Sequence, residues 1–291
     1  MSEKNAVSPV KYLLCGGFGG MCAVAVDHPL EMGIRTLPES VPVTVNNVPE
    51  LFTYFVKTFR SESLKTIYRG SEKRFTTAAS ISSLSFFGYG LGRRLLQKTP
   101  SDDLSFPGLF LAGAFSGLLK SLIVPLRNDN NILNELRSSV KKFDVQGVLQ
   151  LIIKRNGIRN VYDGSRHVFY KEIPLTGLYF MTYDGLRHIM VPEHKRSDIC
   201  VFRTIVAGGM AGIVFSAASI IVDKIQCGCP PGSGFKGLKD SLTNLTKQGD
   251  ILSVYRGYAP VMIRAFPVSA SCFLGFQTCL SVLNWIAPNP I

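Results

Sequence analysis

The chain has 291 residues and a formal net charge of +12, with hydrophobic side chains at 46% of its positions and charged ones at only 18%. This composition is too apolar for an ordinary soluble protein of this size and indicates a membrane protein. The basic charge does not favour nucleic acid, because Lys and Arg are scattered in short stretches such as 141–142 and 195–196 without an aromatic platform or a zinc pattern. A basic envelope suits anionic lipid headgroups or an anionic compartment, and we expect no nucleic-acid partner.

The polar and reactive residues give no sign of an enzyme. The seven cysteines are odd in number and lack framework spacing, which argues against a disulfide scaffold. Cys227 and Cys229 have no His or Cys nearby to complete a tetrahedral metal site. No nucleophile–base set or phosphate-loop motif occurs, so we expect neither catalysis nor a cofactor. Residues 1–11 are polar and too few for a transit peptide, which predicts internal targeting information.

Two short motifs recur with one period. Tyr-Arg-Gly or Tyr-Asp-Gly occurs at 68–70, 162–164 and 255–257, at intervals of 94 and 93 residues (162 − 68 and 255 − 162). A Gly-x-x-x-Gly pair begins at 16, 113 and 208, at intervals of 97 and 95 residues (113 − 16 and 208 − 113). Two independent motifs that recur with nearly the same period indicate a unit that occurs three times in the chain. We place the repeats at 1–99, 100–195 and 196–291, within one transmembrane domain.

In chain order, each repeat predicts two membrane spans around an amphipathic connector helix on the membrane surface. The spans are expected at 12–35 and 74–94, then 107–128 and 166–190, then 202–226 and 259–286. The connectors are expected near 48–60, 144–154 and 235–247. The fold class is therefore an all-α membrane protein with six transmembrane helices in three pseudo-symmetric repeats. An even number of spans returns both termini to one side of the membrane.

Single charges interrupt several of these spans. An ionisable group at membrane depth costs several kcal/mol unless it is paired or wetted, so these charges should face a water-filled interior. They are Asp27, Lys120, Lys171, Glu172, Asp223 and Arg264.

Together these features resemble the mitochondrial carrier family. The resemblance rests on the three repeats, on the Pro-x-acid motif Pro29-Leu30-Glu31 and on its altered copies at 125–130 and 221–226. A similarity to one branch of the family rests on the stretches 86–92, 179–183, 261–267, 272–276 and 283–289. The family resemblance implies a monomeric, multi-pass solute carrier of the mitochondrial inner membrane, with the connector helices on the matrix side. Within the family, the chain is most similar to the branch that exchanges carnitine and acylcarnitines.

The resemblance also implies which residues bind substrate. The family's contacts on the even-numbered spans match Lys171, Glu172 and Arg264, and in the first repeat the small Ala78 and Ala79. Carnitine is a zwitterion, so Glu172 could face its trimethylammonium while Lys171 and Arg264 hold its carboxylate. An acyl tail could rest beside the two alanines. The alternatives are an ion pair between Lys171 and Glu172 that only fastens helices, and a structural Arg264. His28 is a further candidate, or a packed, hydrogen-bonded residue.

The gate motifs depart from the family pattern. On the matrix side the acid positions hold Glu31, Arg127 and Asp223, and the base positions hold Ile34, Asn130 and Gln226. Arg127 could join the two acids in a smaller triad braced by Gln226, or it could extend to the membrane surface. The cytoplasmic gate keeps Asp184 and Arg187, retains Arg93 without its acid, and has Gln277 in an acid's place. Two functions follow as hypotheses: an exchanger with weakened gates, or a carrier-fold protein that binds or regulates without transport.

Overall fold

Six long helices make up the part of the chain that the structure describes. The computed structural model describes residues 9–35, 68, 70–97, 104–128, 166–190, 201–227, 255 and 258–286, and no strand occurs among them. The predicted connectors at 48–60, 144–154 and 235–247 lie outside these residues. The helices are α1 (Pro9–Arg35), α4 (Glu72–Leu96), α5 (Phe106–Asn128), α9 (Arg166–Met190), α10 (Val201–Cys227) and α13 (Ala259–Ile286).

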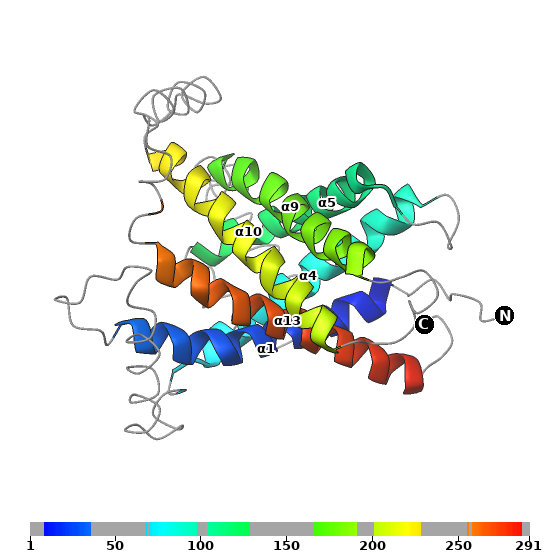
Figure 1. The fold of residues 1–291 in the computed structure, drawn as a ribbon, viewed down its shortest axis with the longest axis horizontal. Coiled ribbons are helices and arrows are strands. Elements are labelled where there is room, and N and C mark those ends of the chain that lie inside the picture. The colour runs from blue at the N-terminus through cyan, green and yellow to red at the C-terminus, as the bar shows by residue number, and fades with distance from the viewer. Residues whose placement is uncertain are drawn as a thin grey trace, which may run out of the picture.

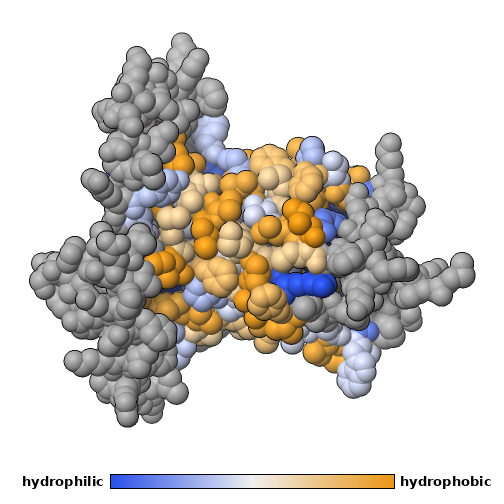
Figure 2. Space-filling model, viewed as in Figure 1, coloured by the Kyte–Doolittle hydropathy of each residue, from blue (hydrophilic) through white to orange (hydrophobic). Residues whose placement is uncertain are grey.

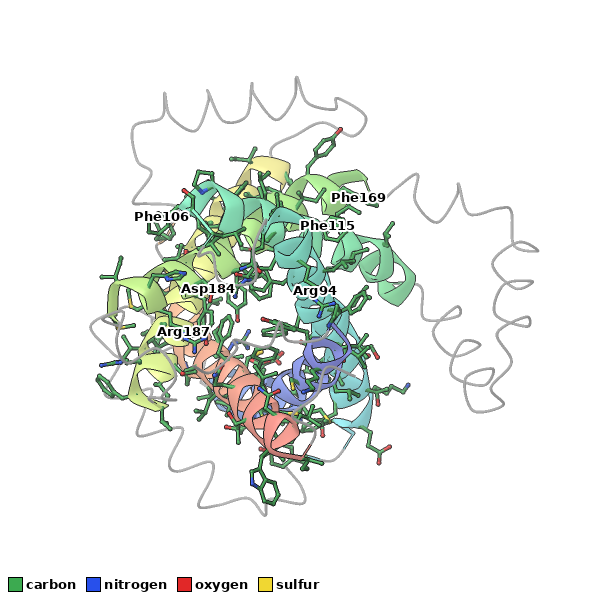
Figure 3. The ribbon with its side chains drawn as sticks, turned by 90° about the vertical axis from the view of Figure 1, so that its right-hand side faces the viewer. Arg94, Phe106, Phe115, Phe169, Asp184 and Arg187 are labelled. Atoms are coloured by element: carbon green, nitrogen blue, oxygen red, sulfur yellow. The ribbon has the colours of Figure 1, made fainter. Side chains whose placement is uncertain are left out.

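The helices form a closed ring. Each packs against the next one along the chain, and α13 packs against α1 (Figure 1). Figure 3 views the ring from the end where α1 begins and α13 ends. At this end, which we call the terminal end, Lys11 Nζ donates a hydrogen bond to Asn284 Oδ1 at 3.1 Å. The ring therefore contains two helices from each repeat, and the last repeat joins the first.

The outer face of the ring is apolar. Hydrophobic side chains cover much of the visible face of the ring (Figure 2). Among the described helices, α1, α10 and α13 are long and apolar enough to cross a membrane by composition alone, and α5 contains a shorter apolar stretch. All six have between 23 and 28 residues, enough to cross a bilayer core. Charged residues on α4 and α9 lower the hydropathy of those helices, and some of them line the site described below. The predicted six-helix transmembrane fold is confirmed.

The repeated glycine pairs pack the two helices of each repeat together. A Cβ on Gly20 would lie 2.8 Å from Ala78 O on α4, and one on Gly212 would lie 2.6 Å from Ala265 O on α13. On α5, a Cβ on Gly117 would lie 2.6 Å from Glu172 O. Small residues allow such close backbone approach between helices in lipid. The glycine period seen in the sequence therefore records three equivalent helix contacts.

The repeated tyrosine fastens the turn before the second helix to the first helix of the same repeat. Tyr68 Oη donates a hydrogen bond to Ala25 O at 2.6 Å, and Tyr255 Oη does the same to Ala217 O at 3.3 Å. Burial raises the pKa of Tyr68, which keeps its hydroxyl protonated as a donor. In the first repeat Gly70 has a φ of 81°, a left-handed conformation that favours glycine.

Candidate functional site

Six buried aromatic rings fill the interior of the ring close to the middle of its helices, on the side of the terminal end. They form three stacked pairs between alternate helices, with centroid distances of 4.2 Å for Tyr89 and Phe180, 3.6 Å for Tyr183 and Phe273, and 4.3 Å for Phe276 and Phe86. Each of α4, α9 and α13 contributes two rings three residues apart. Because these helices are not neighbours, the contacts span the interior of the ring. We call these six residues the aromatic layer; it closes the interior at this level.

A buried carboxylate supports the aromatic layer on its terminal side. Asp184 accepts a hydrogen bond from Tyr89 Oη, and Arg93 Nη1 lies 3.4 Å from Asp184 Oδ2. The contact joins α4 of the first repeat to α9 of the second. Of the residues predicted for the cytoplasmic gate, the structure thus brings Arg93 and Asp184 together. Gln277 is buried directly after Phe276, and Arg187 lies on α9 beyond Asp184 (Figure 3).

A second group of side chains, on the other side of the aromatic layer, carries charge. Ion pairs join neighbouring helices here, with distances of 3.3 Å between Arg264 Nε and Asp27 Oδ1, 2.7 Å between Lys120 Nζ and Glu172 Oε2, and 2.5 Å between Lys171 Nζ and Asp223 Oδ1. Arg74 donates to both carboxylate oxygens of Glu31. We call these eight residues the charged layer. Its four basic groups and four carboxylates balance.

The predicted substrate residues lie in this layer but do not pair with one another. Lys171 and Glu172 are consecutive on α9, yet Lys171 turns to α10 and Glu172 to α5, while Arg264 turns to α1. Their side chains are 23%, 14% and 28% exposed, so all three remain partly accessible to water. An internal ion pair between Lys171 and Glu172 is therefore not how these charges are satisfied.

The smaller predicted residues sit beside α1. The Ala78 and Ala79 carbonyls face Gly20 and Gly17 of α1, and both alanines are half-buried. His28 is buried, with Nδ1 3.3 Å from Arg74 Nη1 and its ring 5.9 Å from that of Tyr68. This environment is that of a packed, hydrogen-bonded histidine next to the charged layer.

The two carboxylates of the predicted matrix gate have separate basic partners. Glu31 pairs with Arg74 and lies 4.0 Å from Arg264, whereas Asp223 pairs with Lys171. Gln226 lies one turn beyond Asp223, near the end of α10. Arg127 is in the last turn of α5, and its side chain lies outside the described part of the structure. The triad of Arg127 with the two acids therefore stays a prediction.

Sequence reasoning assigned no role to Arg74, although this residue holds Glu31 and contacts His28. In the sequence, Arg74 was only the first residue of the span predicted at 74–94. The available signal was a basic residue one helical turn before Ala78, on a helix whose next turns carry small and hydroxylated residues.

Comparison with known proteins agrees with the ring and its threefold repeat. Residues 5–100, 102–194 and 198–286 match the family described as "Mitochondrial carrier protein". The mitochondrial carnitine/acylcarnitine carrier protein of Mus musculus is 38% identical over 99% of both chains. Mitochondrial magnesium exporter 1 of Drosophila melanogaster is 29% identical over 98% of both chains, and the mitochondrial arginine transporter BAC2 of Arabidopsis thaliana is 25% identical over 99% of this chain and 96% of its own. The chain belongs to the mitochondrial carrier family and is a multi-pass solute transporter of the mitochondrial inner membrane.

Proposed function

We propose that this protein exchanges carnitine and acylcarnitines, or a chemically similar zwitterion, across the inner membrane. The observation that carries the proposal is the charge balance of the charged layer, in which four basic groups face four carboxylates. A zwitterion adds one charge of each sign and leaves that balance unchanged. A carnitine/acylcarnitine carrier that is 38% identical over nearly the whole chain supports the same substrate class.

Binding would proceed by exchange of partners. The substrate carboxylate would take the places of Asp27 and Asp223 beside Arg264 and Lys171, and its trimethylammonium would replace Lys120 beside Glu172. The three groups that hold the substrate keep an ion-pair partner, whereas the displaced Asp27, Asp223 and Lys120 would be left to water in the cavity. An acyl tail would extend beside Ala78 and Ala79, which present no charge.

Transport would follow alternating access. With the aromatic layer closed, substrate would reach the charged layer from the end of the ring opposite the terminal end. Closure of that end would use Glu31, Arg127, Asp223 and Gln226, while Arg93, Asp184, Arg187 and Gln277 would release the aromatic layer. Because the ring is complete within one chain, we propose that the protein works as a monomer, with anionic lipid such as cardiolipin on its basic surface.

Other substrates known from relatives fit this charge balance less well. A divalent cation would have to displace basic groups from carboxylates that each already hold one, and arginine would add a net positive charge. The test is counter-exchange in liposomes loaded with carnitine, acylcarnitines, basic amino acids, nucleotides or Mg²⁺. Uptake of labelled carnitine only into carnitine- or acylcarnitine-loaded liposomes is expected. Exchange of another substrate, without carnitine exchange, would reject the proposed specificity.

A second candidate is a carrier-fold protein that binds such a ligand without moving it. Two of the ion pairs support this alternative, because Lys171 with Asp223 joins the second repeat to the third, and Arg264 with Asp27 joins the third to the first. Fastened in this way, the repeats would resist the motions that transport needs. Carnitine-dependent stabilisation in thermal unfolding, without any flux in liposomes, would favour this candidate.

A further inference from the structure

The contact between α1 and α13 is the one junction of the ring formed by the two ends of the chain. The two helices run antiparallel in a fixed register. At the terminal end Lys11 Nζ bonds to Asn284 Oδ1, and further along Ser271 Oγ donates to Cys22 O at 3.4 Å. Between these points the backbones approach closely, since a Cβ on Gly19 would lie 2.6 Å from Cys272 O. No connecting segment between consecutive helices holds this junction together.

Four cysteines lie along this junction, two on each helix. Cys15 and Cys22 are on α1, while Cys272 and Cys279 are on α13, with the same seven-residue spacing on both helices. Antiparallel packing therefore matches Cys15 with Cys279 and Cys22 with Cys272. All four are free thiols.

The two matched pairs differ in their surroundings. Cys15 and Cys279 lie at matched positions of the two helices and both pack in the buried cluster that contains Phe276, whereas Cys22 is not part of that cluster. The Cys22 thiol instead lies against α13 at Gly275, where a Cβ would be 2.7 Å from Cys22 Sγ. Cys15 is fully buried, whereas Cys279 is partly exposed, so one member of the first pair is accessible to a reagent and the other is held behind it.

We propose that Cys15 and Cys279 are a disulfide-forming pair that links the first helix of the ring to the last. The oxidant would be a peroxide. The partly exposed Cys279 attacks one peroxide oxygen as a thiolate, which gives a sulfenic acid and releases one water. The Cys15 sulfur then attacks the Cys279 sulfur, the S–S bond forms and the sulfenic oxygen leaves as a second water. The two thiols are oxidised by two electrons and the peroxide is reduced by the same two.

The linkage would close the ring covalently. In the reduced protein, the contacts between α1 and α13 are non-covalent and include packing, the Lys11–Asn284 and Ser271–Cys22 hydrogen bonds and the Arg264–Asp27 ion pair. A covalent bond at Cys15 would fix the register of the two helices next to the aromatic layer, because Cys15 and Cys279 pack in the same cluster as Phe276. Any motion that requires α1 to shift along α13 would then stop until a dithiol reduces the bond.

The test uses the full chain with Cys200, Cys227 and Cys229 replaced by serine and a protease site inserted within 191–200, so that one cut separates α1 from α13. After oxidation by hydrogen peroxide in liposomes and cleavage, the two fragments are expected to stay joined in a denaturing gel without reductant and to separate with dithiothreitol. Peptide mass spectrometry should identify Cys15 linked to Cys279.

Alanine variants at each of the four junction cysteines show which two residues form the disulfide bond. Cys15→Ala and Cys279→Ala should each abolish the linkage, whereas Cys22→Ala and Cys272→Ala should retain it. Fragments that separate after oxidation in the parent protein, or a linkage that persists in Cys15→Ala, would overturn the proposal. Mass spectrometry of the parent protein decides the question even if a variant fails to fold, and none of these readouts requires transport activity.

Discussion

Lys171 of α9 donates a hydrogen bond to Asp223 of α10 at 2.5 Å, and this ion pair joins the second repeat to the third. Its sequence neighbour Glu172 pairs instead with Lys120 of α5. Consecutive helical residues point about 100° apart, so two adjacent charges on one helix can serve two different neighbours. Helix α9 thus forms ion pairs with both of its neighbours in the ring, α5 and α10.

The first prediction concerns the strength of the Lys171–Asp223 pair. Lys171→Gln and Asp223→Asn should each lower the free energy of unfolding by about 1 kcal/mol or less, because the Asp223 side chain is 50% exposed and water screens the pair. The double variant should cost less than the two single variants together. Thermal unfolding in detergent measures this. The matched control is the double variant Lys171→Gln, Glu172→Gln, whose loss of stability should equal the sum of the losses of its two single variants. If the losses of Lys171→Gln and Asp223→Asn also add in their double variant, the Lys171–Asp223 ion pair does not stabilise the protein.

A second prediction concerns the aromatic layer. Phe273 is 1% exposed and contacts the rings of Phe86, Phe180, Tyr179 and Tyr183. Phe273→Ala should lower the free energy of unfolding by about 3–5 kcal/mol, the range for removing a buried ring, and should make reconstituted liposomes leak small solutes. Phe202→Ala, at a ring that is 72% exposed, should change stability by about 0.5 kcal/mol or less. Equal effects of the two substitutions would show that the layer is not a packed closure.

The third prediction tests the close contact between α5 and α9. A methyl group on Gly117 would meet backbone atoms that cannot rotate away, 2.6 Å from Glu172 O and 2.8 Å from Ile173 Cα. Gly117→Ala should therefore destabilise the protein by about 1–3 kcal/mol. Gly108→Ala is the control, since its methyl group would meet only the flexible Leu104 side chain at 2.8 Å. Similar melting temperatures for the two variants would contradict the packing described for this glycine pair.

The fourth prediction follows from the proposed exchange of partners at Arg264. If the substrate carboxylate replaces Asp27 beside this guanidinium, Asp27→Asn removes a competitor and should lower KM for carnitine by about fivefold, which corresponds to about 1 kcal/mol. Arg264→Gln should raise KM instead. Initial rates of exchange in liposomes give both values, with Glu72→Gln at an exposed site on α4 as the control. A KM unchanged in both variants would exclude Arg264 from the binding site.

Much of the fold could be predicted from the sequence. The spans predicted at 166–190 and 259–286 coincide with α9 and α13, and the other four agree within three residues at each end. Long apolar stretches bounded by charges, repeated three times, leave little freedom in where a membrane helix begins and ends. The glycine pairs likewise mark helix contacts, because no other side chain permits such close backbone approach.

The partners of the charged residues could not be predicted in the same way. Which acid meets Lys171 depends on the rotation of α9 and on which helices flank it in the closed ring, and neither is encoded in the spacing of the charges. The role of Arg74 was missed for the same reason, because its partner Glu31 lies on another helix. The stacked rings, too, come from helices that are not adjacent in the ring, so their pairing depends on closure of the whole ring.

The most direct measurement is the effect of membrane potential on exchange. Liposomes that contain the purified protein are loaded with carnitine, and uptake of labelled carnitine is followed with and without a potassium diffusion potential set by valinomycin. A zwitterionic substrate in a charge-balanced site predicts rapid uptake that depends on internal carnitine and whose rate the potential leaves unchanged. No exchange with any carnitine ester, or an exchange rate that follows the imposed potential, would contradict it.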